Sequence, residues 1–84
     1  MYEIFLTKTF AKELQKIDHK EKERIKKKLK ETTKNPWNYF ERLKGYKLFK
    51  LRVGKYRIIS QINMREKKII LLSVAPRKKA YRKL

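Results

Sequence analysis

The sequence KLFKLRVGKYRI at positions 47–58 alternates apolar and cationic side chains, and this period of two constrains the fold most strongly. Successive side chains of a β-strand point to opposite faces, so Leu51 lies on one face, and Lys50 and Arg52 lie on the other. The Gly-Lys pair at 54–55 fits a two-residue hairpin turn, with glycine at the first central position where positive φ is required. We therefore predict two antiparallel strands with one apolar and one cationic face.

The residues before this hairpin have the pattern of one strand and two helices. YEIFL at 2–6 is a short apolar and aromatic run, which is typical of a strand. Thr7 is a helix-start signal, and apolar residues at helical spacing follow it for about ten residues. Asp18 and Glu21 resemble a capping box that begins a second helix, which we expect to end near Lys34.

The residues after the hairpin indicate one more strand and a tail. A strand at 55–62 and a turn at 63–67 lead to a nearly continuous apolar run at 68–75, which we expect to be a central strand. Pro76 ends it, and a basic tail follows. The order β-α-α-β-β-β predicts an α+β fold in which an antiparallel sheet carries an α-helical hairpin on one face. The length of 84 residues predicts a single domain, residues 1–84, with a thin core.

The net charge of +18 indicates a polyanionic partner, because a self-repelling excess of this size is best neutralised by nucleic acid. Residues 1–40 carry 11 Lys/Arg against 6 Asp/Glu, whereas residues 41–84 carry 15 against 2. The second half is therefore the candidate binding half. A basic surface that only aids solubility is the alternative interpretation.

The chain contains no cysteine, which excludes a disulfide framework and thiolate metal sites. Its N-terminus lacks the pattern of a signal peptide, and no stretch approaches the ~20 apolar residues of a membrane span. We expect a cytoplasmic protein that does not associate with membranes.

Cations from several predicted elements are expected to gather on the sheet face that the helices leave free and wet. Such a cluster is unfavourable unless an anion separates its members, which indicates a phosphate site. A solvated basic face without defined geometry is the equal alternative. The candidate site residues are Lys50, Arg52, Arg57, Arg77 and Tyr81, with Lys47, Lys55, Lys78 and Lys79 as further RNA-binding residues.

The residue types present exclude most catalytic chemistries. Only Glu41 and Glu66 supply carboxylates in the basic half, so a two-metal site is not expected, and we predict neither a metal nor a cofactor. His19, the single histidine, falls beside the second helix start, away from the cations. Arg, Lys and Tyr remain. They can promote RNA cleavage if the ribose 2′-hydroxyl is the nucleophile and the protein orients it and stabilises the phosphorane.

The segments LKGYKLFKLRVGKYRIISQI and IILLSVAPRKKAY resemble the RelE/ParE superfamily of toxins from toxin–antitoxin pairs, specifically its RelE branch. The resemblance extends from the first predicted strand to the tail. It implies a type II toxin that is a ribosome-dependent endoribonuclease and cuts mRNA in the ribosomal A site, without metal, by 2′-hydroxyl attack. It also implies a RelB-like antitoxin partner in a hetero-oligomer.

By position, the catalytic residues of the family correspond to Lys50, Arg52, Arg57, Arg77 and Tyr81. A further active-site lysine of the family falls on Leu48, and Pro76 stands where relatives often have His or Lys. The resemblance implies that Arg57 and Arg77 bind the scissile phosphate and stabilise the transition state. Lys50 and Arg52 would stabilise or help to activate the 2′-oxygen. Tyr81 would stack on the substrate or form a hydrogen bond to it. The alternatives are a noncatalytic RNA- or ribosome-binding module, an inactive toxin relative, and a ParE-like gyrase poison.

Overall fold

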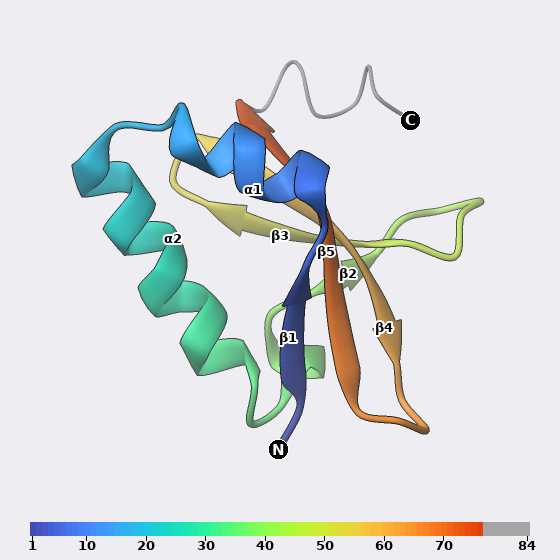
Figure 1. Ribbon diagram of the computed structural model, residues 1–84. Coiled ribbons are helices and arrows are strands. Elements are labelled where there is room, and N and C mark those ends of the chain that lie inside the picture. Colours follow the sequence, from blue (N-terminus) through green and yellow to red (C-terminus); the bar gives the residue numbers. More distant parts are fainter. Residues whose placement is uncertain (77–84) are drawn as a thin grey trace.

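The computed structural model describes residues 1–76, in which the elements follow the order β-α-α-β-β-β-β with a short 3-10 turn before the second strand. Their bounds are β1 Glu3–Leu6, α1 Lys8–Gln15, α2 His19–Thr32, η1 Pro36–Asn38, β2 Glu41–Arg42, β3 Phe49–Val53, β4 Tyr56–Asn63 and β5 Lys68–Pro76 (Figure 1). The predicted α+β class with two consecutive helices is confirmed.

The five strands form one sheet in the order β1-β5-β4-β3-β2. All neighbours are antiparallel except β1 and β5, which pair in parallel with Ile4 opposite Ile69. The expectation of a purely antiparallel sheet was therefore wrong at this edge. Two helices separate β1 from the rest of the sheet, so its direction is not fixed by a tight turn. The prediction that the 68–75 strand lies inside the sheet is confirmed, because β5 lies between β1 and β4.

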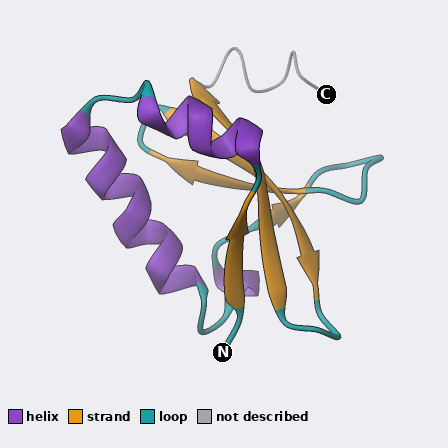
Figure 2. Ribbon diagram, viewed as in Figure 1, coloured by secondary structure: helices purple, strands orange, loops and turns teal. Residues whose placement is uncertain are grey.

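The helices gather at one side of the strands (Figure 2). In Figure 1, α1 crosses the sheet over β5, whereas α2 diverges from α1 and runs past β3 toward η1. Phe10 of α1 and Ile25 of α2 are fully buried in one apolar cluster with Leu51 and Ile58 of the sheet. Each helix therefore packs mainly on the sheet and not along the other helix.

Of the two predicted helix-start signals, Thr7 forms a side-chain cap and Asp18 does not. The Thr7 hydroxyl accepts a hydrogen bond from the Phe10 backbone N–H at 3.1 Å, as an N-cap residue does. Asp18 is also in the N-cap position of α2, but its side chain makes no capping hydrogen bond, so the predicted capping box is not formed. The second helix ends at Thr32, two residues before the predicted end.

The segment expected to be an irregular connector contains two short elements. Pro36 begins η1, and β2 pairs with β3 through Glu41 opposite Lys50. The Trp37 ring contacts the Phe49 ring edge-on with centroids 5.4 Å apart, which fastens η1 to β3. Among residues 1–76, no helix has the length and apolar character needed to cross a bilayer.

Candidate functional site

The sheet face opposite the helices, which we call the outer face, brings together Lys50, Arg52 and Arg57. Arg52 and Arg57 are direct partners across the β3–β4 pair, and Lys50 lies two residues before Arg52 on the same face of β3. Side chains directly opposite each other have Cβ atoms about 4.5–5.5 Å apart, so the two arginine side chains leave the outer face from adjacent points. We call these three residues the cation cluster.

The members of the cation cluster differ in exposure. Arg52 is exposed, the Lys50 side chain is 26% exposed, and Arg57 is only 4% exposed. The expectation of a wet outer face is therefore wrong at Arg57, and also at Ile59, which is 2% exposed. Both residues lie on the middle strand, where side chains of β3 and β5 flank them on each side.

Like charges directly opposite each other on a sheet are destabilising, and partial burial strengthens their repulsion. An anion bound between Arg52 and Arg57 would remove this repulsion and accept hydrogen bonds from two planar guanidinium groups. Lys50 adds a third positive charge on the same face of β3, two residues before Arg52. The arrangement therefore favours a phosphate group over a neutral ligand.

Contacts from α1 and its N-cap residue fix the part of β5 beside Arg57. The ladder between β4 and β5 shifts register after Ile59, which leaves Leu72 outside the pairing. The Thr7 hydroxyl donates to the Leu71 carbonyl at 2.9 Å, and the Val74 N–H donates to Glu13 Oε1 at 3.0 Å. Because Ala75 is the β5 partner of Arg57, these bonds hold the neighbouring backbone in place.

The β3–β4 turn has the predicted geometry. Gly54 has φ +58°, and a Cβ at this position would lie 3.1 Å from Arg24 Nη1 and 3.4 Å from Glu21 Oε2 of α2. The turn therefore lies beside the side chains of Glu21 and Arg24 in the first half of α2. Lys55 lies on this side, because its Nζ is 5.7 Å from the Tyr56 ring centroid and it lines a pocket with Asp18, Glu21 and Arg24. The structure does not bring Lys55 into the cation cluster.

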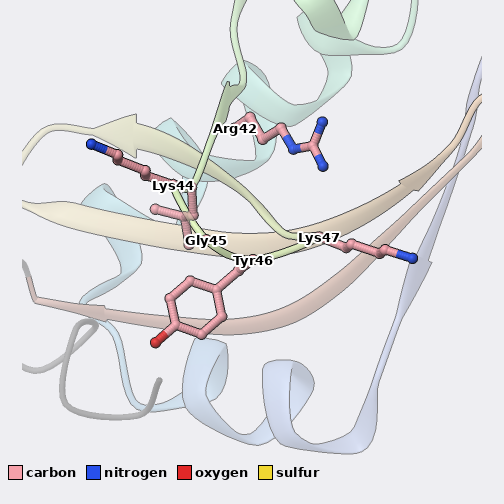
Figure 3. A pocket seen from close by; sticks show the side chains of 6 residues that line it. Arg42, Lys44, Gly45, Tyr46 and Lys47 are labelled. Atoms are coloured by element: carbon pink, nitrogen blue, oxygen red, sulfur yellow. The ribbon is translucent and has the colours of Figure 1, made fainter.

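Lys47 belongs to the loop between β2 and β3 and not to the cluster. This loop surrounds a pocket of about 430 Å³, whose lining includes Arg42, Lys44, Tyr46 and Lys47. Lys44 and Lys47 point in opposite directions (Figure 3). The loop therefore exposes two lysines and the Tyr46 ring, but the two lysine side chains do not converge on one ligand position.

Four predicted site residues, Arg77, Lys78, Lys79 and Tyr81, lie outside the described residues. One residue that the sequence analysis did not assign to the site is Glu41, whose Oε2 lies 3.6 Å from Lys50 Nζ. No periodic signal indicated its position, because β2 has only two residues. Residues 1–76 contain no group of three or more His, Cys, Asp or Glu side chains able to hold a metal ion.

Comparison with known proteins shows the family. The profile of the ParE toxin family of type II toxin–antitoxin systems matches residues 4–81. No curated protein sequence matches the chain.

Solved toxin structures share the fold. The RelE toxin in the RelB–RelE complex from Methanococcus jannaschii is 30% identical, with a TM-score of 0.74 over 92% of this chain and 94% of that one. The archaeal RelE–RelB complex from Pyrococcus horikoshii gives 25% identity and a TM-score of 0.79 over 90% and 94%. The isolated Escherichia coli RelE toxin gives 22% identity and a TM-score of 0.77 over both full chains. This chain therefore belongs to the ParE toxin family of type II toxin–antitoxin systems and is a RelE-type member of the RelE/ParE superfamily.

Proposed function

We propose that this toxin is a ribosome-dependent endoribonuclease that cleaves mRNA in the ribosomal A site without a metal ion. The observation that carries the proposal is the opposition of Arg52 and Arg57, with Lys50 beside them on the same face. Three cations on adjacent rigid strands suit a phosphodiester whose negative charge increases in the transition state. The similarity to RelE toxins supports the same chemistry.

In the proposed reaction the ribose 2′-oxygen attacks the adjacent phosphorus. The bond from the 2′-oxygen to phosphorus forms, and the bond from phosphorus to the 5′-oxygen of the next nucleotide breaks. The 2′-hydroxyl loses its proton and the departing 5′-oxygen gains one, which gives a 2′,3′-cyclic phosphate and a 5′-hydroxyl end. The protein contributes orientation, charge stabilisation and proton transfer.

The cluster residues have separate roles in this proposal. Arg57, buried and held between two strands, binds the scissile phosphate with a fixed planar fork. Lys50 and Arg52 stabilise the 2′-oxygen as it becomes an anion. Arg77 provides the second phosphate contact, and Tyr81 stacks on or hydrogen-bonds to the substrate. Lys47, Lys55, Lys78 and Lys79 contribute longer-range attraction to the RNA backbone.

We further propose that a RelB-like antitoxin binds this chain and neutralises part of its charge. The targets of the free toxin are ribosomes and mRNA in the cytoplasm. The solved complexes of the Methanococcus jannaschii and Pyrococcus horikoshii relatives contain RelB together with RelE. The net charge of +18 supports an acidic partner segment, because complementary charge accelerates association and excludes wrong partners.

Mapping of mRNA 5′ ends after controlled expression tests the function. We expect new ends inside translated reading frames, each with a 5′-hydroxyl, and none in mRNA whose start codon is removed. When ribosomes are left out of a purified translation reaction, the toxin should leave the same mRNA intact. Cleavage of free mRNA at equal rate, or growth arrest with no new ends, would contradict the proposal.

A noncatalytic RNA-binding module is the second candidate. It is favoured by Leu48, which occupies the position of an active-site lysine of the family, and by the ion pair that engages Lys50. Such a module would bind ribosomes with strong salt dependence and leave every mRNA uncut.

A further inference from the structure

Glu41 places a carboxylate at the edge of the cation cluster. It is the direct partner of Lys50 across the β2–β3 pair, so both side chains lie on the outer face. Its Oε2 is 3.6 Å from Lys50 Nζ, and the Glu41 side chain is 75% exposed while that of Lys50 is 26% exposed. The Glu41 side chain is thus largely accessible to solvent, whereas most of the Lys50 side chain is covered.

The position of Glu41 is unusual among the carboxylates of this chain. The sequence has eight Asp and Glu residues, and five of them lie at 13–31, on the two helices or the link between them. Glu3 is opposite Lys68 across β1 and β5, and Glu66 is in the β4–β5 turn. Among the carboxylates of residues 1–76, only Glu41 has a member of the cation cluster as its direct strand partner.

A carboxylate beside a phosphate site weakens phosphate binding. It repels the phosphate, and it forms an ion pair with a cation that would otherwise bind the phosphate. An ion pair with one well-exposed member exchanges readily, since such pairs contribute only about 0–1 kcal/mol. RNA can therefore displace Glu41 from Lys50 at low cost. The result is an anion site that is already filled, weakly, by the protein itself.

We propose that Glu41 is a positioning residue that stands in for an RNA phosphate: its carboxylate holds the Lys50 ammonium on the outer face until a backbone phosphate replaces it. This inference rests on the proposed RNA-binding function of the cation cluster. Glu41 keeps Lys50 directed across the strands and away from Arg57, and it lowers the affinity for RNA in general. Only RNA that also engages Arg52 and Arg57 compensates for the displaced carboxylate.

Glu41→Gln tests this inference, because it removes the charge and keeps the shape of the side chain. Binding is measured by fluorescence anisotropy with the full chain and a short labelled single-stranded RNA whose 2′-hydroxyls are methylated, so that cleavage does not interfere. We expect the variant to bind about three- to fivefold more tightly at low salt, the scale of one exposed ion pair. The slope of log affinity against log salt should steepen by about 0.7, the value for one additional phosphate contact on a single strand.

Glu66→Gln is the matched control, since Glu66 Oε1 also lies 3.6 Å from a lysine, Lys68, and the variant changes the net charge equally. It should leave affinity and salt slope nearly unchanged. A second control is the double variant Lys50→Gln with Glu41→Gln. If Glu41 acts through Lys50, adding Glu41→Gln to Lys50→Gln should raise the RNA affinity far less than Glu41→Gln does in the parent chain.

Two results would overturn the inference. One is equal tightening by Glu66→Gln, which would show a general charge effect. The other is a full gain from Glu41→Gln in the Lys50→Gln background, which would show that Glu41 acts without Lys50. If Lys50→Gln and Arg52→Gln leave RNA binding at the parental level, the proposed function of the cluster fails together with this inference. If those two variants bind weakly but Glu41→Gln changes nothing, the inference alone fails.

Discussion

The two faces of the same sheet serve different purposes, although their residues alternate along the same strands. On β3, Leu51 and Val53 face the helices and are each 3% exposed, whereas Lys50 and Arg52 between them lie on the outer face. On β4, Ile58 is fully buried among core residues and its neighbour Arg57 is buried on the opposite side. The helix-covered face therefore provides stability, and the outer face can carry charge at fixed positions because the other face supports the backbone.

The largest effect should come from removing a side chain of the helix-covered face. Phe10 is fully buried, so Phe10→Ala should lower the free energy of unfolding by about 3–5 kcal/mol, through lost burial and the cavity that remains. Urea denaturation followed by circular dichroism measures this. A loss below about 1 kcal/mol would show that the helix-covered face is not the main source of stability.

A charge-conserving change on the outer face should act on chemistry. Arg57→Lys keeps the charge but loses the planar fork, so single-turnover cleavage on ribosomes should fall by about 10²-fold, the scale for loss of one transition-state donor. Arg65→Lys, in the exposed β4–β5 turn, is the control and should cleave like the parent chain. Parental cleavage by Arg57→Lys would exclude bidentate phosphate binding at this residue.

The turn that joins the two strands should have an intermediate effect. Gly54→Ala should cost somewhat more than the ~1–2 kcal/mol of the left-handed backbone alone, because φ is +58° and the new Cβ would also meet Arg24. Gly45→Ala, with φ +83° and no atom within 4 Å of the new Cβ, carries only the backbone cost and should destabilise less. Thermal unfolding of both variants gives the difference. Equal losses would show that the contact with α2 contributes nothing to holding the turn.

The smallest effect should have opposite signs for stability and for binding. Arg52→Gln removes one of two facing guanidinium groups, so the free energy of unfolding should rise by about 0.2–1 kcal/mol. The same variant should bind single-stranded RNA more weakly and with a shallower salt dependence. A loss of stability would mean that Arg52 supports the fold, and the division between the two faces would not hold at this residue.

Features that depend on local sequence were predictable. The period of two between Phe49 and Val53 and the glycine at position 54 set the register, and the register places Arg52 opposite Arg57. Thr7 begins α1 because its hydroxyl can accept from a backbone N–H three residues later. The gathering of three cations follows from these short-range rules.

Features that depend on long-range packing were not predictable. The parallel pairing of β1 with β5 joins segments more than sixty residues apart, and neither segment contains a signal for the direction. The two-residue β2 strand is too short for periodicity, so Glu41 was not placed beside Lys50. Lys55 belongs to a correctly predicted turn, but this turn lies beside α2, and Lys55 lines a pocket there instead of joining the cation cluster.

The central claim is that cleavage depends on cations of the outer face and not on the total charge. Two double variants test it directly, because each removes two positive charges: Lys50→Gln with Arg52→Gln on the outer face, and Lys27→Gln with Lys30→Gln on the exposed side of α2. The measurement is single-turnover mRNA cleavage on programmed ribosomes with toxin already bound. We predict that the outer-face variant loses about 10²-fold or more in rate, while the α2 variant stays within about threefold of the parent. Equal losses in both, or a larger loss in the α2 variant, would contradict the account.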